Sequence, residues 1–282
     1  METQDKIKRL KGRFSTLLVA LMFLAGIGIM LYPAVSDLWN RQWNNQMKSV
    51  YRNSVNTYSE ETLKEEWGKA RAYNIQHKTN TVRDAFDNDE YIKTHPYSDL
   101  LNPGKNGIMG YVEIPKINQE IVIYHGTASK SLERGCGHVE GTSLPTGGKN
   151  THAVIAAHRG LPGAKLFSDL DKLKEGDNFY LRILDKKLAY RVDQIKTVKP
   201  ENVSYLEIVA GEDYVTLLTC TPYGVNTHRL MVRGCRAAYK EHEGIDSPLM
   251  SFFDSWQFKI LIAAAVIAAA VFFVRRYRNR KG

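Results

Sequence analysis

Residues 214–234 read YVTLLTCTPYGVNTHRLMVRG, and this stretch decides the fold class. Two runs rich in β-branched and large apolar residues, Tyr214–Thr219 and Arg229–Gly234, flank a turn-rich segment. Such runs predict two strands joined as a long hairpin. If the two strands pair, Cys220 at the end of the first and Arg229 at the start of the second lie at the same edge.

Short β-runs of the same kind recur from Ile108 onward. They are rich in Val, Ile, Tyr and Leu, and turns containing Gly, Pro or Asp separate most of them. Seven or eight short strands within about 130 residues predict a mainly β domain, either a closed barrel or a sandwich. A short helix is expected at Ala164–Leu173. The other predicted strands are Gly110–Ile114, Glu120–Tyr124, His152–Ala157, Phe179–Leu184 and Lys187–Val198.

The segment before the β-runs predicts one or two helices. Residues 37–76 are polar and contain a single glycine and no proline. Ser59, followed by two glutamates, is typical of an N-cap with acidic residues in the first turn. Leu63, Trp67 and Ala70 fall on one helical face. We expect these helices to link the β domain to the segment before it.

The excess positive charge of the chain lies at its two ends. The net charge is +9, of which residues 1–35 contribute +3 and residues 256–282 contribute +6. Residues 36–255 are therefore neutral. A high pI can indicate nucleic-acid binding, but here the excess charge does not lie on the domain between the two ends. We expect no nucleic-acid partner.

Two apolar segments beside these basic ends predict membrane spans. No residue from Ser15 to Ser36 is charged. Leu17–Tyr32 is almost continuously apolar and is long enough for a helix that crosses about 30 Å of hydrocarbon. Ile260–Val274 is apolar throughout and reaches the required length if Lys259 extends to the interface. The basic flanks place both ends in the cytoplasm. A cleaved signal peptide is the alternative for the first segment.

Three cysteines lie between the two predicted spans, and an odd number leaves at least one thiol unpaired. Cys220 ends one predicted strand, Arg229 begins the next, and His158 follows a third. A neighbouring imidazole favours the thiolate or supplies a proton to a leaving amine, and a guanidinium stabilises an oxyanion. From these residues alone, a small buried cysteine is the alternative. Whether Cys136 and Cys235 pair stays open.

Longer motifs in the same region resemble the sortase family of transpeptidases. Residues 216–220, Thr-Leu-Leu-Thr-Cys, match the TLxTC signature, and Arg229 stands nine residues on, as the family's arginine does. The resemblance covers about residues 108–238 closely, and the two-span layout extends it to the whole chain. The segments that are similar to class C, the pilus-assembling sortases, are HVEGTSLP (138–145), AHRGLP (157–162) and CTPYGVNTHR (220–229).

This resemblance implies an eight-stranded β-barrel with short helices and a cysteine transpeptidase. We expect no cofactor. It implies cleavage of an LPxTG-like sorting signal between Thr and Gly, an acyl-thioester on Cys220, and transfer to a lysine amine of another pilin subunit. The family's histidine role maps onto His158 and its arginine role onto Arg229. The alternatives are a housekeeping-type sortase that anchors surface proteins to peptidoglycan, or a non-catalytic scaffold that binds sorting signals.

The resemblance also implies a lid before the barrel. Class C sortases carry an Asp-Pro-aromatic motif there, and the corresponding stretch is Asp84-Ala85-Phe86, within the irregular segment Lys78–Gly107. The aspartate lies near the arginine in the family, and the aromatic ring lies over the cysteine. Proline is absent here, so the turn is less preset. An ordinary charged loop is the alternative for Asp84 and Phe86.

Other polar residues are weaker candidates. His228 is adjacent to Arg229, but neighbouring residues of a strand face opposite ways. His138 and His152 are expected to be hydrogen-bonded residues of the scaffold. No group of residues has the spacing of metal ligands, and we expect no metal site.

The predicted protein is a two-span membrane enzyme with an extracellular catalytic domain, and its partners are the membrane and pilin subunits that carry an acceptor lysine. Its predicted segments are a basic cytoplasmic N-terminus (1–14), a transmembrane helix (15–36), a helical linker with the lid (37–107), the catalytic barrel (108–240), a juxtamembrane linker (241–255), a second transmembrane helix (256–274) and a basic cytoplasmic tail (275–282).

Overall fold

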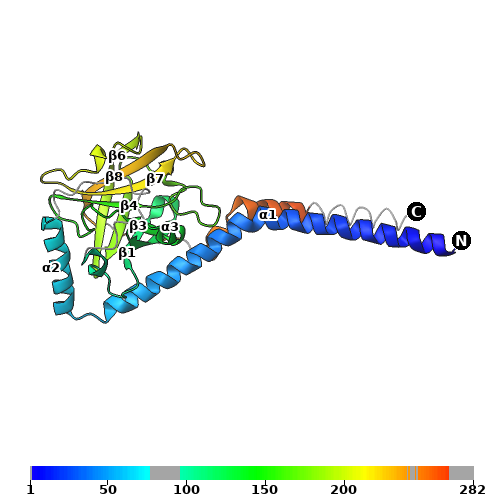
Figure 1. Ribbon diagram of the computed structural model, residues 1–282, viewed down its shortest axis with the longest axis horizontal. Coiled ribbons are helices and arrows are strands. Elements are labelled where there is room, and N and C mark those ends of the chain that lie inside the picture. The colour runs from blue at the N-terminus through cyan, green and yellow to red at the C-terminus, as the bar shows by residue number, and fades with distance from the viewer. Residues whose placement is uncertain (1, 77–95, 240, 242–244, 246, 267–282) are drawn as a thin grey trace. The chain divides into compact units, whose positions relative to one another are not determined.

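A computed structural model describes residues 2–76, 96–239, 241, 245 and 247–266. The chain divides into two compact units. One unit comprises Met1–Leu38 and Ser247–Gly282, and the other comprises Trp39–Asp246. The second unit holds all the strands (Figure 1).

In the described part of the chain, eight strands close into a barrel in the order β1-β2-β3-β4-β7-β8-β6-β5. Two neighbouring pairs, β2 with β3 and β4 with β7, are parallel, and the others are antiparallel. The closed barrel confirms the eight strands that the family resemblance implies and excludes the sandwich. The strands are β1 (Ile108–Ile114), β2 (Gln119–His125), β3 (Cys136–His138), β4 (Thr151–Ala156), β5 (Asn178–Ile183), β6 (Lys186–Val198), β7 (Asp213–Thr221) and β8 (His228–Ala237).

The core lies inside the barrel and reaches to the helices that cover it. Every residue of β1 and of β4 is buried, as expected for strands covered on both faces. In β6 the buried residues all lie in the first half of the strand, and no residue from Asp193 to Val198 is buried. The 3-10 turn η2 (Pro96–Asp99) precedes β1, and the short helices between strands are α3 (Ser129–Arg134) and the 3-10 turns η3 (Pro115–Ile117), η4 (Leu170–Lys172) and η5 (Ser204–Leu206).

The predicted helix at Ala164–Leu173 is wrong. The segment is a series of turns that ends in η4. Leu166 has a φ of 36°, and a right-handed helix cannot continue through such a residue. The Phe167 N–H instead donates to the carbonyl oxygen of His158 at 3.2 Å. The apolar residues that suggested a helix are buried in the core from a turn-rich backbone.

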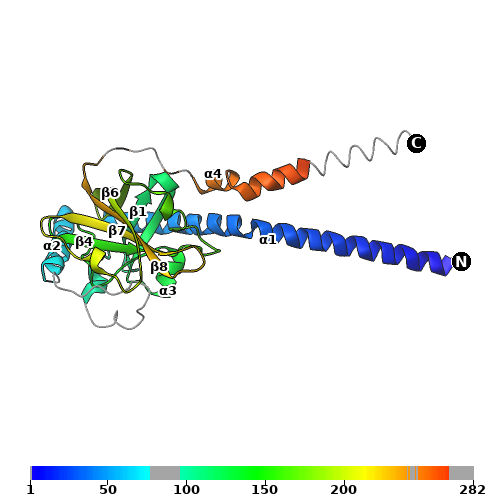
Figure 2. The same cartoon turned by 90° about the horizontal axis from the view of Figure 1, so that it is seen from above.

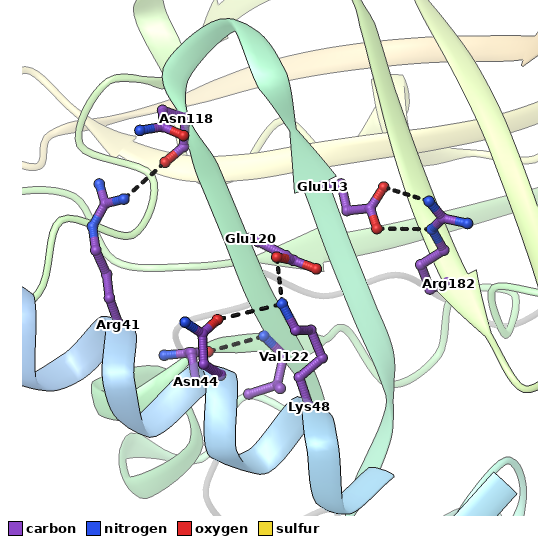
Figure 3. Close-up of polar contacts among 9 residues, drawn as sticks. Arg41, Asn44, Lys48, Glu113, Asn118, Glu120, Val122 and Arg182 are labelled. Carbon is purple, nitrogen blue, oxygen red and sulfur yellow. Dashed lines mark hydrogen bonds and ion pairs between the residues drawn. The ribbon is translucent and has the colours of Figure 1, made fainter. Parts of the chain in front are cut away.

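Helix α1 (Glu2–Asn56) docks its last turns on the outside of the β1–β2 hairpin (Figure 3). The Asn44 side chain accepts from the Val122 N–H at 3.0 Å and donates to the Arg134 carbonyl at 2.9 Å. Lys48, one turn later, forms an ion pair with Glu120. Polar side chains along one face of α1 therefore contact β2 and the end of α3.

Tyr51 completes this contact with two buried hydrogen bonds. Its hydroxyl donates to the Met109 carbonyl at 2.9 Å and accepts from the Leu184 N–H at 2.7 Å. The ring is 1% exposed. A single α1 side chain thus bridges β1 and the β5–β6 turn, which fixes the helix on the barrel.

Helix α2 (Glu60–Gln76) follows α1 and confirms the helical prediction for residues 37–76. The Ser59 hydroxyl accepts from the Thr62 N–H at 3.1 Å, as an N-cap does. Trp67 and Ala70 are buried, and Leu63 packs beside the core. Asn74, near the end of α2, donates to the Leu144 carbonyl at 3.1 Å.

The other unit contains the apolar part of α1, α4 (Pro248–Phe253) and a short helix at Trp256–Val266. Leu21–Asn56 is long and apolar enough to cross a membrane, and Met22, Phe23 and Ile29 are 67%, 66% and 76% exposed. This is consistent with an N-terminal membrane anchor. Trp256–Val266 is shorter than a full span, and residues 267–282 lie outside the described part. The second span stays a prediction.

Candidate active site

Three neighbouring strands bring the three sequence-predicted residues to one edge of the barrel. β7 lies between β4 and β8 in the sheet (Figure 2). In the parallel β4–β7 pair, Ala156 is the partner of Leu218. His158 and Cys220 each follow two residues later, so they occupy equivalent positions along the two chains, His158 just beyond the end of β4 and Cys220 at the second-last residue of β7. Cys220 is also the direct partner of Arg229 in the antiparallel β7–β8 pair.

The alternation of side chains places these three residues on a common face. Directly opposite residues of paired strands point to the same side of a sheet. Cys220 and Arg229 are such a pair, and His158 occupies the equivalent level beyond the end of β4. The geometric placement that the sequence leaves open for His158 is therefore supplied by the parallel pairing.

Two buried contacts hold the ends of β4 and β7 in this register. The Ala157 N–H donates to the Leu218 carbonyl at 3.1 Å. The Thr219 hydroxyl donates to the Ala157 carbonyl at 2.7 Å, and both residues are fully buried. Thr219 directly precedes Cys220, and Ala157 directly precedes His158. A hydrogen bond therefore joins the two residues that position the thiol and the imidazole.

Arg159 makes the matching contact on the other side. Its Nη1 donates to the Thr221 hydroxyl at 3.0 Å, and its Nη2 forms an ion pair with Asp171 at 2.5 Å. The Arg159 side chain is only 10% exposed. Thr221 directly follows Cys220, as Arg159 follows His158. Hydrogen bonds therefore join the two segments both one residue before and one residue after Cys220 and His158.

The loops beyond these strand ends also pack together. Gly160 has a φ of +80°, and a Cβ at this position would lie 3.2 Å from the Tyr223 ring. Only glycine combines this backbone conformation with the close approach of the ring. Tyr223 and Val225, in the β7–β8 loop, are 61% and 64% exposed. The candidate site therefore has an exposed apolar rim next to Cys220.

His158 is half-buried, and its environment favours the neutral imidazole. Burial lowers the pKa of His158 below its ordinary value, and the charge of Glu133 on α3 partly offsets this effect. A neutral imidazole is the form that accepts a proton from an attacking amine. The environment of His158 therefore favours the form that accepts a proton.

Arg229 is the second residue of β8 and is 8% exposed. Its Nη1 donates to the backbone carbonyl oxygens of Asn226 at 3.3 Å and of His228 at 3.4 Å. These contacts anchor one nitrogen of the guanidinium to the β7–β8 loop. A planar guanidinium fork suits an oxyanion, because it presents several N–H donors in one plane.

The three thiols differ in their surroundings. No disulfide joins them, which answers the open question about Cys136 and Cys235. Cys136 is fully buried, and burial raises its thiol pKa well above the ordinary value, so its thiolate is disfavoured. Cys235 lies near the far end of β8, opposite Tyr214. Cys220 is the half-buried thiol at the strand edge that also carries His158 and Arg229.

The remaining candidates are placed as follows. His228 is the partner of Thr221, and its Nδ1 lies 2.9 Å from the Thr227 hydroxyl. His138 and His152 are buried and hydrogen-bonded, as the sequence predicts for scaffold residues. The proposed lid residues, Asp84 and Phe86, lie outside the described residues, so the lid stays a prediction.

Sequence reasoning missed the flanking residues Thr219, Arg159 and Thr221. A signal for them exists, because two strands that carry site residues at equivalent positions must be held together there. That signal becomes readable only when β4 and β7 are known to be parallel neighbours. The sequence separates them by about 60 residues and gives no indication of the pairing.

Comparison with known proteins identifies the class to which this site belongs. Residues 112–237 match the model of the sortase domain family. The solved structure of sortase C from Streptococcus pneumoniae is 48% identical, covers 69% of this chain and 97% of that chain, and superposes with a TM-score of 0.65. Sortase C1 of Streptococcus agalactiae is 45% identical, covers 68% of this chain and 94% of that chain, with a TM-score of 0.63.

Curated relatives agree with the solved structures at lower identity. Sortase A of Streptococcus agalactiae is 24% identical over 253 residues, which is 87% of this chain and 95% of the relative. Sortase D of Bacillus subtilis is 28% identical over 169 residues, 60% of this chain and 78% of the relative. The chain belongs to the sortase family, and its solved relatives include sortase C enzymes. Members of this family are cysteine transpeptidases that act on sorting signals, and this chain is an enzyme of that type.

Proposed function

We propose that the chain polymerises pilin subunits, with Cys220 as nucleophile, His158 as proton-transfer group and Arg229 as oxyanion stabiliser. The observation that carries this proposal is the parallel register of β4 and β7 together with the pairing of Cys220 with Arg229 on β8. Identities of 45% and 48% to sortase C enzymes support the pilus class. The structural study of the pneumococcal relative concerns pilin substrate specificity.

In the first half-reaction, neutral His158 takes the proton of the Cys220 thiol, and the thiolate attacks the carbonyl carbon of the threonine in an LPxTG-like signal. The carbonyl electron pair moves onto oxygen, and the guanidinium of Arg229 donates hydrogen bonds to this oxyanion. The C–N bond then breaks, and protonated His158 gives its proton to the leaving glycine amine. The product is an acyl-thioester on Cys220, and His158 is left neutral.

In the second half-reaction, a neutral lysine amine of another pilin subunit attacks the thioester carbonyl. Arg229 stabilises the second oxyanion, and His158 takes the proton that the amine loses. The C–S bond breaks, which returns the thiolate of Cys220 and leaves an isopeptide bond between the subunits. Protonated His158 then returns this proton to the Cys220 thiolate, so the thiol and the neutral imidazole are restored and no external proton source is required.

The membrane arrangement is part of the same proposal. The apolar helix from Leu21 anchors the chain, and the basic N-terminal flank lies in the cytoplasm. The segment 256–274 forms the second span and is followed by the basic tail. The barrel then lies outside the cytoplasm, where its substrates are displayed. A reporter that is active only outside the cytoplasm, fused after Gly282, tests the second span and should be silent.

The experiment uses the full chain in nonionic detergent with a sorting-signal peptide and three acceptors: a lysine-bearing pilin domain, a peptidoglycan-type amine and water. We expect a Cys220-linked acyl intermediate by mass spectrometry and covalent pilin ladders. Cys220→Ala should abolish both products, and the half-buried Cys235→Ala should retain both. Transfer to the wall-type amine alone would establish the anchoring alternative. Absence of the acyl intermediate would overturn the catalytic assignment.

A further inference from the structure

A second site candidate lies at the end of the barrel opposite Cys220. A cavity of about 620 Å³ is bordered by Thr151 at the start of β4, Asp213 at the start of β7 and Arg236 near the end of β8. The candidate catalytic residues occupy the other ends of these strands. The seven-residue separation of Asp213 from Cys220 along β7 corresponds to about 23 Å. This cavity is therefore separate from the active site.

The walls of this cavity carry an excess of positive charge. Its lining contains Arg71 of α2, Lys149, Lys186 of β6 and Arg236, and its single carboxylate is Asp213. Among the described residues, none of these four cations is in an ion pair. Four charges of one sign around a single cavity repel one another, and an anionic ligand would relieve this repulsion.

Aromatic rings hold three of these cations in place. The Lys186 Nζ lies 4.3 Å from the centroid of the Trp67 ring, and the Arg71 guanidinium lies 6.0 Å from the same ring. The Arg236 guanidinium lies 5.5 Å from the centroid of Tyr190. A ring face orients a cation without neutralising its charge. The N–H donors of Arg71 and Lys186 therefore stay available to a ligand, whereas Arg236 also interacts with the Tyr190 hydroxyl.

The one carboxylate in the wall is already engaged by the protein. Asp213 Oδ2 accepts from the Gly148 N–H at 2.7 Å, and Oδ1 accepts from the Tyr190 hydroxyl at 3.0 Å. These bonds tie the loop of residues 146–150 to the barrel. Asp213 thus builds the wall and leaves its surroundings with a net positive charge.

The loop itself adds backbone donors. Gly147 and Gly148 have φ values of +64° and +109°, which side chains other than glycine rarely adopt. The N–H groups of Gly147 and Lys149 have no hydrogen-bond acceptor among the described residues. The Gly148 N–H between them is bonded to Asp213 Oδ2, so Gly147 and Lys149 are the backbone donors of this turn that remain for a phosphate oxygen. Asn74 ties this loop to α2 through bonds of 3.1 Å to the Leu144 carbonyl and 3.0 Å to the Thr146 hydroxyl.

We propose that this cavity binds a ligand that carries at least two phosphate groups. Two guanidinium forks and two ammonium groups match several phosphate oxygens at once, and the glycine loop supplies backbone donors. The volume lies in the range of sites for extended organic ligands, well above that needed for one phosphate. The phosphates belong either to a soluble phosphodiester chain or to lipid headgroups. The proposal does not depend on the transpeptidase chemistry.

Binding of inorganic tripolyphosphate to the full chain in nonionic detergent tests the site, with titration calorimetry as the readout. We expect saturable binding with one site per chain and at least tenfold weaker binding of orthophosphate. The double variant Arg71→Gln/Lys149→Gln removes two exposed cations of the cavity and should weaken tripolyphosphate binding by about tenfold or more. Lys174→Gln, an exposed lysine outside the cavity, is the matched control and should change affinity less than twofold.

Labelling of Cys220 by a small thiol reagent checks that each variant is folded, and its rate should be unchanged. Absence of saturable binding by the wild type, or equal weakening in Lys174→Gln and the double variant, would overturn the proposal. Nanodiscs of phosphatidylcholine and of phosphatidylglycerol at about 0.15 M salt separate the two sources of phosphate. Tenfold weaker tripolyphosphate binding in phosphatidylglycerol assigns the site to lipid headgroups. Equal affinity in the two assigns it to a soluble ligand.

Discussion

The Thr219 hydroxyl donates a 2.7 Å hydrogen bond to the Ala157 carbonyl in the interior of the barrel. These two residues directly precede Cys220 and His158. The bond joins two parallel strands at the point where both must deliver a reactive side chain. Its contribution is therefore expected to be seen in catalysis as well as in stability.

Thr219→Val tests this contact, because it keeps the shape of the side chain and removes the donor. The Ala157 carbonyl would then lose a buried hydrogen bond, at a cost of about 1–3 kcal/mol in the free energy of unfolding. We expect kcat to fall and KM for the sorting-signal peptide to stay near its original value, because the groups that react are misaligned. Thr219→Ser keeps the hydroxyl and should restore most of kcat. If Thr219→Val reduces stability but leaves kcat intact, Thr219 has a structural role only.

The Arg159 contacts allow a comparison of two bonds made by one side chain. Thr221→Val removes the 3.0 Å contact beside Cys220, and Asp171→Asn weakens the ion pair on the exposed side. We expect Thr221→Val to lower kcat several-fold, and Asp171→Asn to have a smaller effect, because exposed ion pairs contribute only about 0–1 kcal/mol. Single-turnover acylation kinetics measure both variants. Equal losses would show that Arg159 acts through overall loop stability and not through Thr221.

Arg229→Lys should be almost as damaging as Arg229→Ala. Lysine keeps the charge but lacks the planar fork, and its shorter reach changes the direction of the donors. Loss of one oxyanion donor commonly lowers the rate by about two to three powers of ten. The rate of acyl-enzyme formation, followed by mass spectrometry, distinguishes the two explanations. If lysine restores most of the rate, Arg229 contributes charge and not directed hydrogen bonds.

The stability of the barrel should fall as the pH decreases from about 6.5 to 4. Burial lowers the pKa of His138 and of His152 to about 4. In this pH range the unfolded chain binds protons that the folded chain does not, so protonation favours unfolding. Each histidine can remove up to about 3 kcal/mol from the free energy of unfolding. Urea unfolding of the full chain in detergent, followed by tryptophan fluorescence at several pH values, measures this loss.

Variants separate the two histidines from the carboxylates that also titrate at low pH. His138→Gln and His152→Gln can keep a hydrogen bond and remove the titrating ring, so each should flatten the pH dependence. His228→Gln is the control, because His228 lies in the β7–β8 hairpin outside the buried core. An unchanged pH dependence in both buried variants would contradict the assignment of the pH effect to His138 and His152.

The sequence predicts long strands well and short or irregular elements poorly. β6 and β7 are long runs rich in Val, Leu, Ile and Tyr, and such runs are recognised as strands from the sequence. β3 has only three residues, too few to show an alternation, and it depends on its pairing with β2 and β4. At Ala164–Leu173 the apolar residues follow the demands of the core, and Leu166 breaks the backbone path that a helix needs.

The candidate site likewise contains one part that the sequence predicts and one part that it does not. Cys220 and Arg229 belong to one hairpin, so their proximity can be predicted from the sequence alone. His158 lies on a strand that is distant in sequence, and parallel pairing across such a distance leaves no local pattern. Its residue identity can be predicted from the motif, but its position cannot. The cationic cavity was not predicted, because its charges come from α2, a loop and two strands.

Because β4 and β7 pair in parallel, the candidate site depends on the number of residues in each strand before His158 and Cys220. A single residue inserted into β7 before Cys220 would turn the thiol to the opposite face of the sheet. Two inserted residues would restore the face but displace the thiol by about 6.6 Å from His158. Substitutions within the two strands alter packing, whereas changes in strand length alter which atoms meet. Insertions and deletions are therefore expected to be tolerated in the loops. They are expected to be excluded from Thr151 to His158 and from Asp213 to Cys220.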